Sequence, residues 1–98
     1  LTADIIGSAQ AKEMGLVSEV YASEELMDKA MELAEKIASK AQIAVRQSKR
    51  CIRRGLQTDM YTGAAYEAEA FGLCFATDDQ KGAMKAFVNK EKYGFSNR

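Results

Sequence analysis

Residues 23–40 read SEELMDKAMELAEKIASK, and this stretch decides the fold class. Its apolar residues recur at helical spacing and would share one face: Leu26, Ala30, Leu33, Ala34 and Ile37. Ser23 is the expected N-cap, and Glu24 and Glu25 would lie in the first turn, where the helix dipole favours negative charge. The pattern therefore predicts an amphipathic helix over residues 23–40.

Two further helices are predicted directly after this one. The first covers residues 42–54, with Gly55 as its C-cap, and the second covers residues 58–75. Small or apolar residues surround most of the 58–75 helix, so we expect it to be buried on more than one side. A domain of this size has too few other elements to cover it, so a partner is expected.

The two ends of the chain complete the pattern. Thr77-Asp78-Asp79-Gln80 matches a capping box and predicts a helix that continues to about Lys92, before Gly94 ends it. Residues 8–14 indicate a short helix closed by Gly15, and residues 16–21 could be an extended piece. The predicted fold class is all-α, with four to five helices in one domain over residues 1–98.

Composition limits the class of protein. Of the 98 residues, 47% are apolar and 29% charged, and 14 basic residues balance 14 acidic ones. This balance gives no overall field to attract nucleic acid or an anionic membrane, and no apolar run approaches the ~18 residues of a membrane span. Cys51 and Cys74 are too few for a disulfide framework, so we expect reduced thiols and a cytoplasmic protein.

Residue types that carry catalysis are scarce. The chain has no His, and its sequence shows no metal-ligand spacing and no nucleophile–base pair. Glu67 and Glu69 lie two positions apart on a helix, about 200° from each other, so they cannot act together on one substrate. From the residues alone we expect a helical domain with an association surface and no catalytic or metal site.

Residues 36–58 contain seven basic residues and no acid: Lys36, Lys40, Arg46, Lys49, Arg50, Arg53 and Arg54. Two interpretations remain open. The segment could bind phosphate, on a nucleic acid or a phosphate-bearing cofactor, or it could be a solvated helix face. No aromatic residue alternates with these charges, which disfavours stacking of single-stranded nucleic acid.

Three stretches carry a family resemblance when taken together. Residues 1–6 read LTADII, followed by Ala9, Ala11 and GLV at 15–17. Residues 44–50 read AVRQSKR. Residues 67–79 read EAEAFGLCFATDD, with AFVNKEK at 86–92. In this order and spacing they resemble the enoyl-CoA hydratase/isomerase (crotonase) family.

The resemblance covers the whole chain but only the C-terminal third of a typical member. It implies that residues 1–98 are the C-terminal trimerisation region of a crotonase-fold protein, without its ββα spiral core. Family members reversibly hydrate trans-2-enoyl-CoA to 3-hydroxyacyl-CoA, using an oxyanion hole and two glutamates that lie upstream of this region. We therefore expect the parent protein to be an enoyl-CoA hydratase, with a coenzyme A thioester as substrate and no separate cofactor, and these 98 residues to be inactive alone.

The resemblance also implies specific contacts. Lys90 would neutralise a phosphate of CoA, commonly CoA bound to the adjacent subunit, and Phe87 would pack against its adenine or pantetheine side. Leu73 and Phe75 would border the acyl pocket. The expected partners are further copies of the chain, as a trimer or dimer of trimers, and the acyl-CoA substrate, with neither nucleic acid nor membrane.

Two positions depart from the family pattern. Ala3 stands where Gly is usual, and Gly82-Ala83 stands where Glu-Gly is usual, which affects the helix that carries Phe87 and Lys90. The alternatives are a free-standing helical oligomerisation or binding module and a small helical nucleic-acid binder. The sequence leaves open the acyl-chain length, the direction of flux and the choice between hydratase and isomerase.

Overall fold

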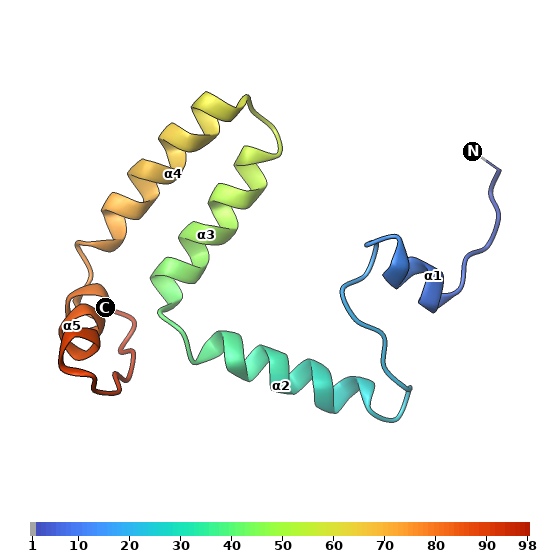
Figure 1. Cartoon of the computed structure of the whole chain (residues 1–98), viewed down its shortest axis with the longest axis horizontal. Helices are drawn as coiled ribbons and strands as arrows, with labels where there is room; N and C mark the ends of the chain where they lie inside the picture. The colour runs from blue at the N-terminus through green and yellow to red at the C-terminus, as the bar shows by residue number, and fades with distance from the viewer. Residues whose placement is uncertain (1) are drawn as a thin grey trace. The chain divides into compact units, whose positions relative to one another are not determined.

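The computed structural model describes residues 2–98 and shows five α-helices, with no strand in that range (Figure 1). The helices are α1 (Ser8–Glu13), α2 (Leu26–Ala38), α3 (Gln42–Gly55), α4 (Met60–Cys74) and α5 (Asp78–Asn89). The predicted all-α class is therefore confirmed. The chain divides into two units, Leu1–Glu35 and Lys36–Arg98. No helix within residues 2–98 has the length and apolar character needed to cross a bilayer.

The first unit contains α1 and most of α2. The helix α1 ends where Gly15 takes a positive φ of 75°, and the Gly15 N–H donates to the Lys12 carbonyl at 3.0 Å. The closing glycine was therefore predicted correctly. The extended piece expected at 16–21 forms no strand and consists of bends and irregular backbone.

The start of α2 differs from the prediction. The helix begins at Leu26, and the Ala22 carbonyl accepts hydrogen bonds from the N–H groups of Glu25 and Leu26, each at 3.0 Å. Ser23 lies inside this turn and is not the N-cap. Serine is a good capping residue, but here the acceptor is the backbone carbonyl of Ala22, the residue before Ser23.

In the second unit, α3 and α4 pack side by side as an antiparallel hairpin (Figure 1). Asp59 caps α4 by accepting the Thr62 N–H at 2.9 Å. Hydrogen bonding from Thr62, first from its side chain and then from this N–H, holds the pKa of Asp59 below its ordinary value. The guanidinium of Arg54 lies 4.8 Å from the centre of the Tyr66 ring and adds a cation–π contact across the hairpin. The Asp59 cap and the Arg54–Tyr66 contact thus hold the two helices together near the loop that connects them.

The helix α5 begins as predicted and ends earlier than predicted. The Thr77 hydroxyl accepts the Gln80 N–H at 3.2 Å, which confirms the N-cap. The helix stops at Asn89, because Lys90 takes the left-handed conformation (φ 57°, ψ 35°) and serves as C-cap. The expected end near Gly94 was wrong: residues 91–98 instead fold back, and the Arg98 carbonyl accepts the N–H groups of Asp78 and Asp79.

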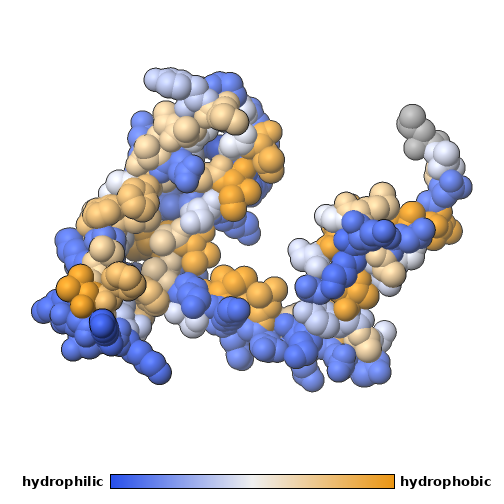
Figure 2. Space-filling view, viewed as in Figure 1, coloured by the Kyte–Doolittle hydropathy of each residue, from blue (hydrophilic) through white to orange (hydrophobic). Residues whose placement is uncertain are grey.

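Very little apolar surface is buried. Within residues 2–98 the only buried apolar side chains are three alanines, Ala11, Ala70 and Ala86. Met60 and Tyr61, at the start of α4, are 90% and 86% exposed, and α3 is the only helix that makes extensive contacts with α4 in the described residues. The covering of α4 on further sides by a partner stays a prediction. Apolar residues gather on the surface of each unit (Figure 2). Exposure on this scale is typical of a surface that another polypeptide covers.

Candidate functional site

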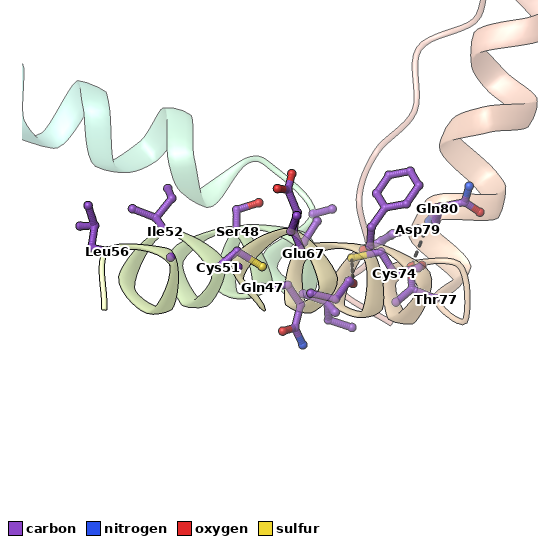
Figure 3. A pocket seen from close by; sticks show the side chains of 18 of the residues that line it. Gln47, Ser48, Cys51, Ile52, Leu56, Glu67, Cys74, Thr77, Asp79 and Gln80 are labelled. Carbon is purple, nitrogen blue, oxygen red and sulfur yellow. Dashed lines mark hydrogen bonds between the residues drawn. The ribbon is translucent and has the colours of Figure 1, made fainter. Parts of the chain in front are cut away.

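An apolar groove of about 1060 Å³ runs along the α3–α4 hairpin to the start of α5 and Phe95 (Figure 3). Its apolar walls come from both helices of the hairpin: Ile43, Ala44, Ile52, Leu56, Met60, Ala64, Ala70 and Phe71. The amphipathic pattern of α3 explains the groove, because apolar residues of this helix line it, whereas Arg46, Lys49, Arg50 and Arg53 do not. A groove of this composition suits an apolar helix or sheet face.

Few polar side chains enter this groove, and they are not arranged for catalysis. Cys51 comes from α3 and Cys74 from α4, and they lie at separate places along the groove (Figure 3). The Cys74 thiol donates to the Ala70 carbonyl at 3.4 Å, inside its own helix. Glu67 lines the groove but has no hydrogen-bonded partner within the second unit. Within the residues that line it, the groove shows no nucleophile with a base beside it.

A buried carboxylate closes one end of the groove. Asp79 is only 1% exposed, and it accepts the Ser96 N–H and the Asn97 N–H, both at 2.7 Å. The Ser96 hydroxyl at 3.2 Å and the Tyr93 hydroxyl at 3.4 Å complete its shell. Burial raises the pKa of this carboxyl, but the hydrogen bonds from Ser96, Asn97 and Tyr93 outweigh it and hold the pKa below its ordinary value. Asp79 thereby fastens residues 93–97 to α5.

Gly82 gives this fastened segment room to pack. A Cβ atom at Gly82 would overlap the ring of Tyr93, so only glycine lets the ring lie against α5. The Tyr93 ring in turn meets the Phe95 ring edge to face, with ring centroids 5.3 Å apart, a favourable geometry for an aromatic pair. Burial and the nearby Asp79 charge raise the pKa of Tyr93. The Gly82-Ala83 departure from the family pattern thus has a structural reason, and α5 stays regular around it.

The two predicted CoA-binding residues lie on one turn at the end of α5. The Lys90 N–H donates to the Phe87 carbonyl at 3.2 Å, so the structure brings these residues together. Phe87 is 79% exposed, and neither residue lines the groove. Their role toward CoA stays a prediction.

The two predicted acyl-pocket residues lie at the end of α4. Leu73 is 54% exposed and Phe75 is 48% exposed, and neither lines the groove. Phe75 meets Phe71 edge to face with ring centroids 5.1 Å apart, and Phe71 does line the groove. Their contact with an acyl chain also stays a prediction.

The sequence analysis did not find Asp79 and its partners. The capping motif marked Asp79 as a first-turn acid, and that position is correct. Its hydrogen-bond donors, however, lie 14 to 18 residues further along the chain. No local sequence pattern predicts that these donors bind Asp79. The one available signal is the Ser96-Asn97 pair, because serine and asparagine are common in turns.

A second, smaller hollow of about 390 Å³ is lined by residues of α3 alone. Four of its lining residues are basic, Arg46, Lys49, Arg50 and Arg53, beside Ile43 and Gln47. Within residues 36–98 no carboxylate forms an ion pair with them. Both predicted interpretations of this segment, phosphate binding and a solvated face, fit an exposed basic helix. Among residues 2–98 no three Cys, Asp or Glu side chains come together as a metal site would need.

Comparison with known proteins gives consistent results. A family described as "Enoyl-CoA hydratase/isomerase" matches residues 1–98. A short-chain-enoyl-CoA hydratase of Clostridium acetobutylicum is 51% identical over 98 residues, which cover 99% of this chain and 38% of that protein. A crotonyl-CoA hydratase of Syntrophomonas wolfei is 48% identical over 94 residues, covering 96% of this chain and 36% of that protein. The chain thus spans less than two fifths of the length of these relatives.

Solved structures agree with the sequence matches. A crystal structure of an enoyl-CoA hydratase from Geobacillus kaustophilus superposes with a TM-score of 0.95 at 30% identity, over 99% of this chain and 37% of that one. One from Bacillus anthracis gives a TM-score of 0.85 at 38% identity, over 93% and 35%. In both cases the similarity covers nearly all of this chain and little more than a third of the solved one.

Proposed function

This chain belongs to the enoyl-CoA hydratase/isomerase family, and we propose that it is the C-terminal helical part of an enoyl-CoA hydratase. Such an enzyme adds water to a trans-2-enoyl-CoA to give a 3-hydroxyacyl-CoA, or catalyses the reverse dehydration. The observation that carries the proposal is the match over the full 98 residues to relatives named as hydratases, at up to 51% identity among those described above.

We propose that these helices contribute assembly and binding, and that bond-making belongs to another part of the protein. The groove is apolar, and Glu67 and Glu69 have no partner in the second unit that would make them an acid–base pair. Exposed apolar residues on α4 and α5 support self-association, as a trimer or a dimer of trimers, because each would be covered by another polypeptide.

We further propose that the end of α5 contacts the CoA part of the substrate. Phe87 and Lys90 are exposed on one turn, where an aromatic ring and a cation could meet an adenine or pantetheine group and a phosphate. Leu73 and Phe75, at the end of α4, offer apolar surface for the acyl pocket. These assignments rest on the family resemblance and on exposure.

The chain's own inactivity can be tested directly. The 98-residue chain is mixed with crotonyl-CoA, and the enoyl absorbance is followed. We expect no loss above the uncatalysed rate, because no nucleophile–base pair is present in the second unit. Clear turnover would contradict the assignment of catalysis to another segment.

A second candidate is a helical oligomerisation module that has no role in CoA binding. The apolar groove favours it, since the groove alone would support association. Calorimetric titration of the chain with free CoA separates the two candidates: measurable binding that weakens in Lys90→Ala but not in Lys85→Ala supports the CoA role. Self-association without any CoA binding supports the second candidate.

A further inference from the structure

The zero net charge of this chain conceals a strong separation of charge between its two units. The unit Leu1–Glu35 has eight acidic and two basic residues, for a net charge of −6. The unit Lys36–Arg98 has six acidic and twelve basic residues, for a net charge of +6. Every copy of the chain therefore carries one strongly acidic and one strongly basic unit, and this polarity favours association between unlike units of two copies.

Each unit carries several charges of one sign along one helix face. On α2, Asp28, Glu32 and Glu35 fall at positions i, i+4 and i+7, which places them on one stripe. All three are exposed, and only Glu32 has an ion-pair partner within its unit, Lys29 at 3.2 Å. We call these three residues the acidic stripe.

The corresponding face of α3 carries Arg46, Lys49, Arg50 and Arg53, which we call the basic stripe. These four side chains are exposed, line the 390 Å³ hollow and have no carboxylate partner within residues 36–98. The acidic stripe runs from 28 to 35 and the basic stripe from 46 to 53, so each is about 10.5 Å long at 1.5 Å per residue. The two stripes match in length and are opposite in sign.

We infer that the acidic stripe of one copy docks on the basic stripe of a second copy. This inference rests on the self-association proposed above and specifies which surfaces meet. Because the two stripes are different patches, the contact is head to tail. Each docked pair still has one free acidic and one free basic stripe, so further copies can add until a ring closes. The charges orient the copies, and the exposed apolar surface beside them supplies most of the affinity.

The ionic part of the contact can be tested with salt. Sedimentation equilibrium of the full 98-residue chain is measured at low salt and in about 1 M NaCl, where the screening length falls to about 3 Å. The association constant is expected to fall at least about tenfold. An association that is unchanged or stronger at high salt overturns the inference.

Charge reversal identifies the stripes. We expect D28K/E32K/E35K and R46E/R50E/R53E each to weaken self-association at least about tenfold, whereas K81E/K85E/K92E, which changes the charge of the second unit equally but away from α3, leaves it within about twofold. A 1:1 mixture of the two stripe variants regains association, because each supplies a stripe of the sign that the other needs. Circular dichroism of each variant checks that helix content is kept.

The remaining outcomes all overturn the inference, and they differ in what else they affect. In one alternative, the two stripes of a single chain pair with each other. Association would then return only in a chain that carries all six substitutions, and not in the mixture of the two stripe variants. If inorganic pyrophosphate binds the basic stripe and D28K/E32K/E35K associates normally, the stripe is an anion site. A wild-type chain that stays monomeric would contradict both the stripe pairing and the proposed self-association. If the wild type associates and no stripe variant changes that association, only the stripe pairing is contradicted.

Discussion

The side-chain oxygen Oδ1 of Asn97 accepts a hydrogen bond from the backbone N–H of Gln42 at 2.9 Å, across 55 residues of sequence. The first turn of α3 has no capping side chain of its own, because Ala41 precedes it. The cap is therefore supplied from the far end of the chain. Asn97 reaches this position with a positive φ of 63°, a conformation that asparagine tolerates better than most residues.

Asn97→Ala should lower the free energy of unfolding by about 1 kcal/mol, because it removes the acceptor at the start of α3. Asn97→Asp keeps an acceptor and a left-handed preference, so its loss should be much smaller. Thermal unfolding followed by circular dichroism gives the comparison. Equal losses in the two variants would show that the Gln42 contact does not stabilise the helix.

Stability should depend on pH through Asp79. Its pKa in the folded chain is lowered below the ordinary 3.8, so the stabilisation is fully present above that value and is lost as pH falls through the lower, folded pKa. The melting temperature of the wild type should therefore drop steeply below about pH 4. The melting temperature of Asp79→Asn should be several degrees lower than that of the wild type at pH 7, and it should depend less steeply on pH.

Asp78→Asn is the matched control for this experiment, since Asp78 is the neighbouring acid in the same helical turn. It should keep the steep slope of the wild type. Some slope will remain in Asp79→Asn, because the pKa of Asp59 is also lowered by its hydrogen bonds to Thr62. Identical slopes in all three proteins would disprove a special role for Asp79.

Gly82→Ala should destabilise the chain by about 1 kcal/mol in net terms. Alanine gains roughly 1 kcal/mol of helix propensity, but its Cβ displaces the Tyr93 ring, and overpacking of this kind costs about 1–3 kcal/mol. Gly72→Ala, on α4 with open space around it, should instead be stabilising. In a Tyr93→Ala background the cost of Gly82→Ala should disappear, and chemical denaturation of the four proteins tests this coupling.

Lys90→Gly separates folding from CoA binding. Glycine relieves the left-handed backbone strain at this position, so the chain should gain up to about 1 kcal/mol of stability. The same change removes the cation, so CoA affinity should fall about threefold to tenfold. Thermal unfolding and calorimetric titration with CoA give the two values. A parallel rise of both would exclude Lys90 as a phosphate contact.

The sequence predicted best what depends on neighbouring residues. Thr77 was identified as an N-cap because its hydroxyl and the Gln80 N–H are three residues apart, and apolar periodicity together with capping and glycine signals located the helices. The end of α5 was missed because the fold-back anchored on Asp79 fixes Lys90 in a conformation that lysine does not favour by itself. Ser23 was mistaken for a cap because a local signal competed with a turn that Ala22 closes.

The candidate site was predictable only in part, for the same reason. Resemblance identified Phe87 and Lys90, and the structure places them on one turn. The apolar groove depends on how α3 and α4 pack, and the periodicity of each helix could not give that pairing. The burial of Asp79 depends on donors up to 18 residues away, which is beyond the reach of helix periodicity and capping patterns.

A core of three alanines has a calorimetric consequence. The heat capacity of unfolding follows the apolar area that becomes hydrated, so the lone chain should unfold with an unusually small heat-capacity change and a broad, weak endotherm. Once other polypeptide surfaces close over its apolar faces, the same 98 residues should contribute a heat-capacity change nearer to that of ordinary globular domains. We therefore expect much of the cooperativity of these helices to depend on the surfaces that cover them.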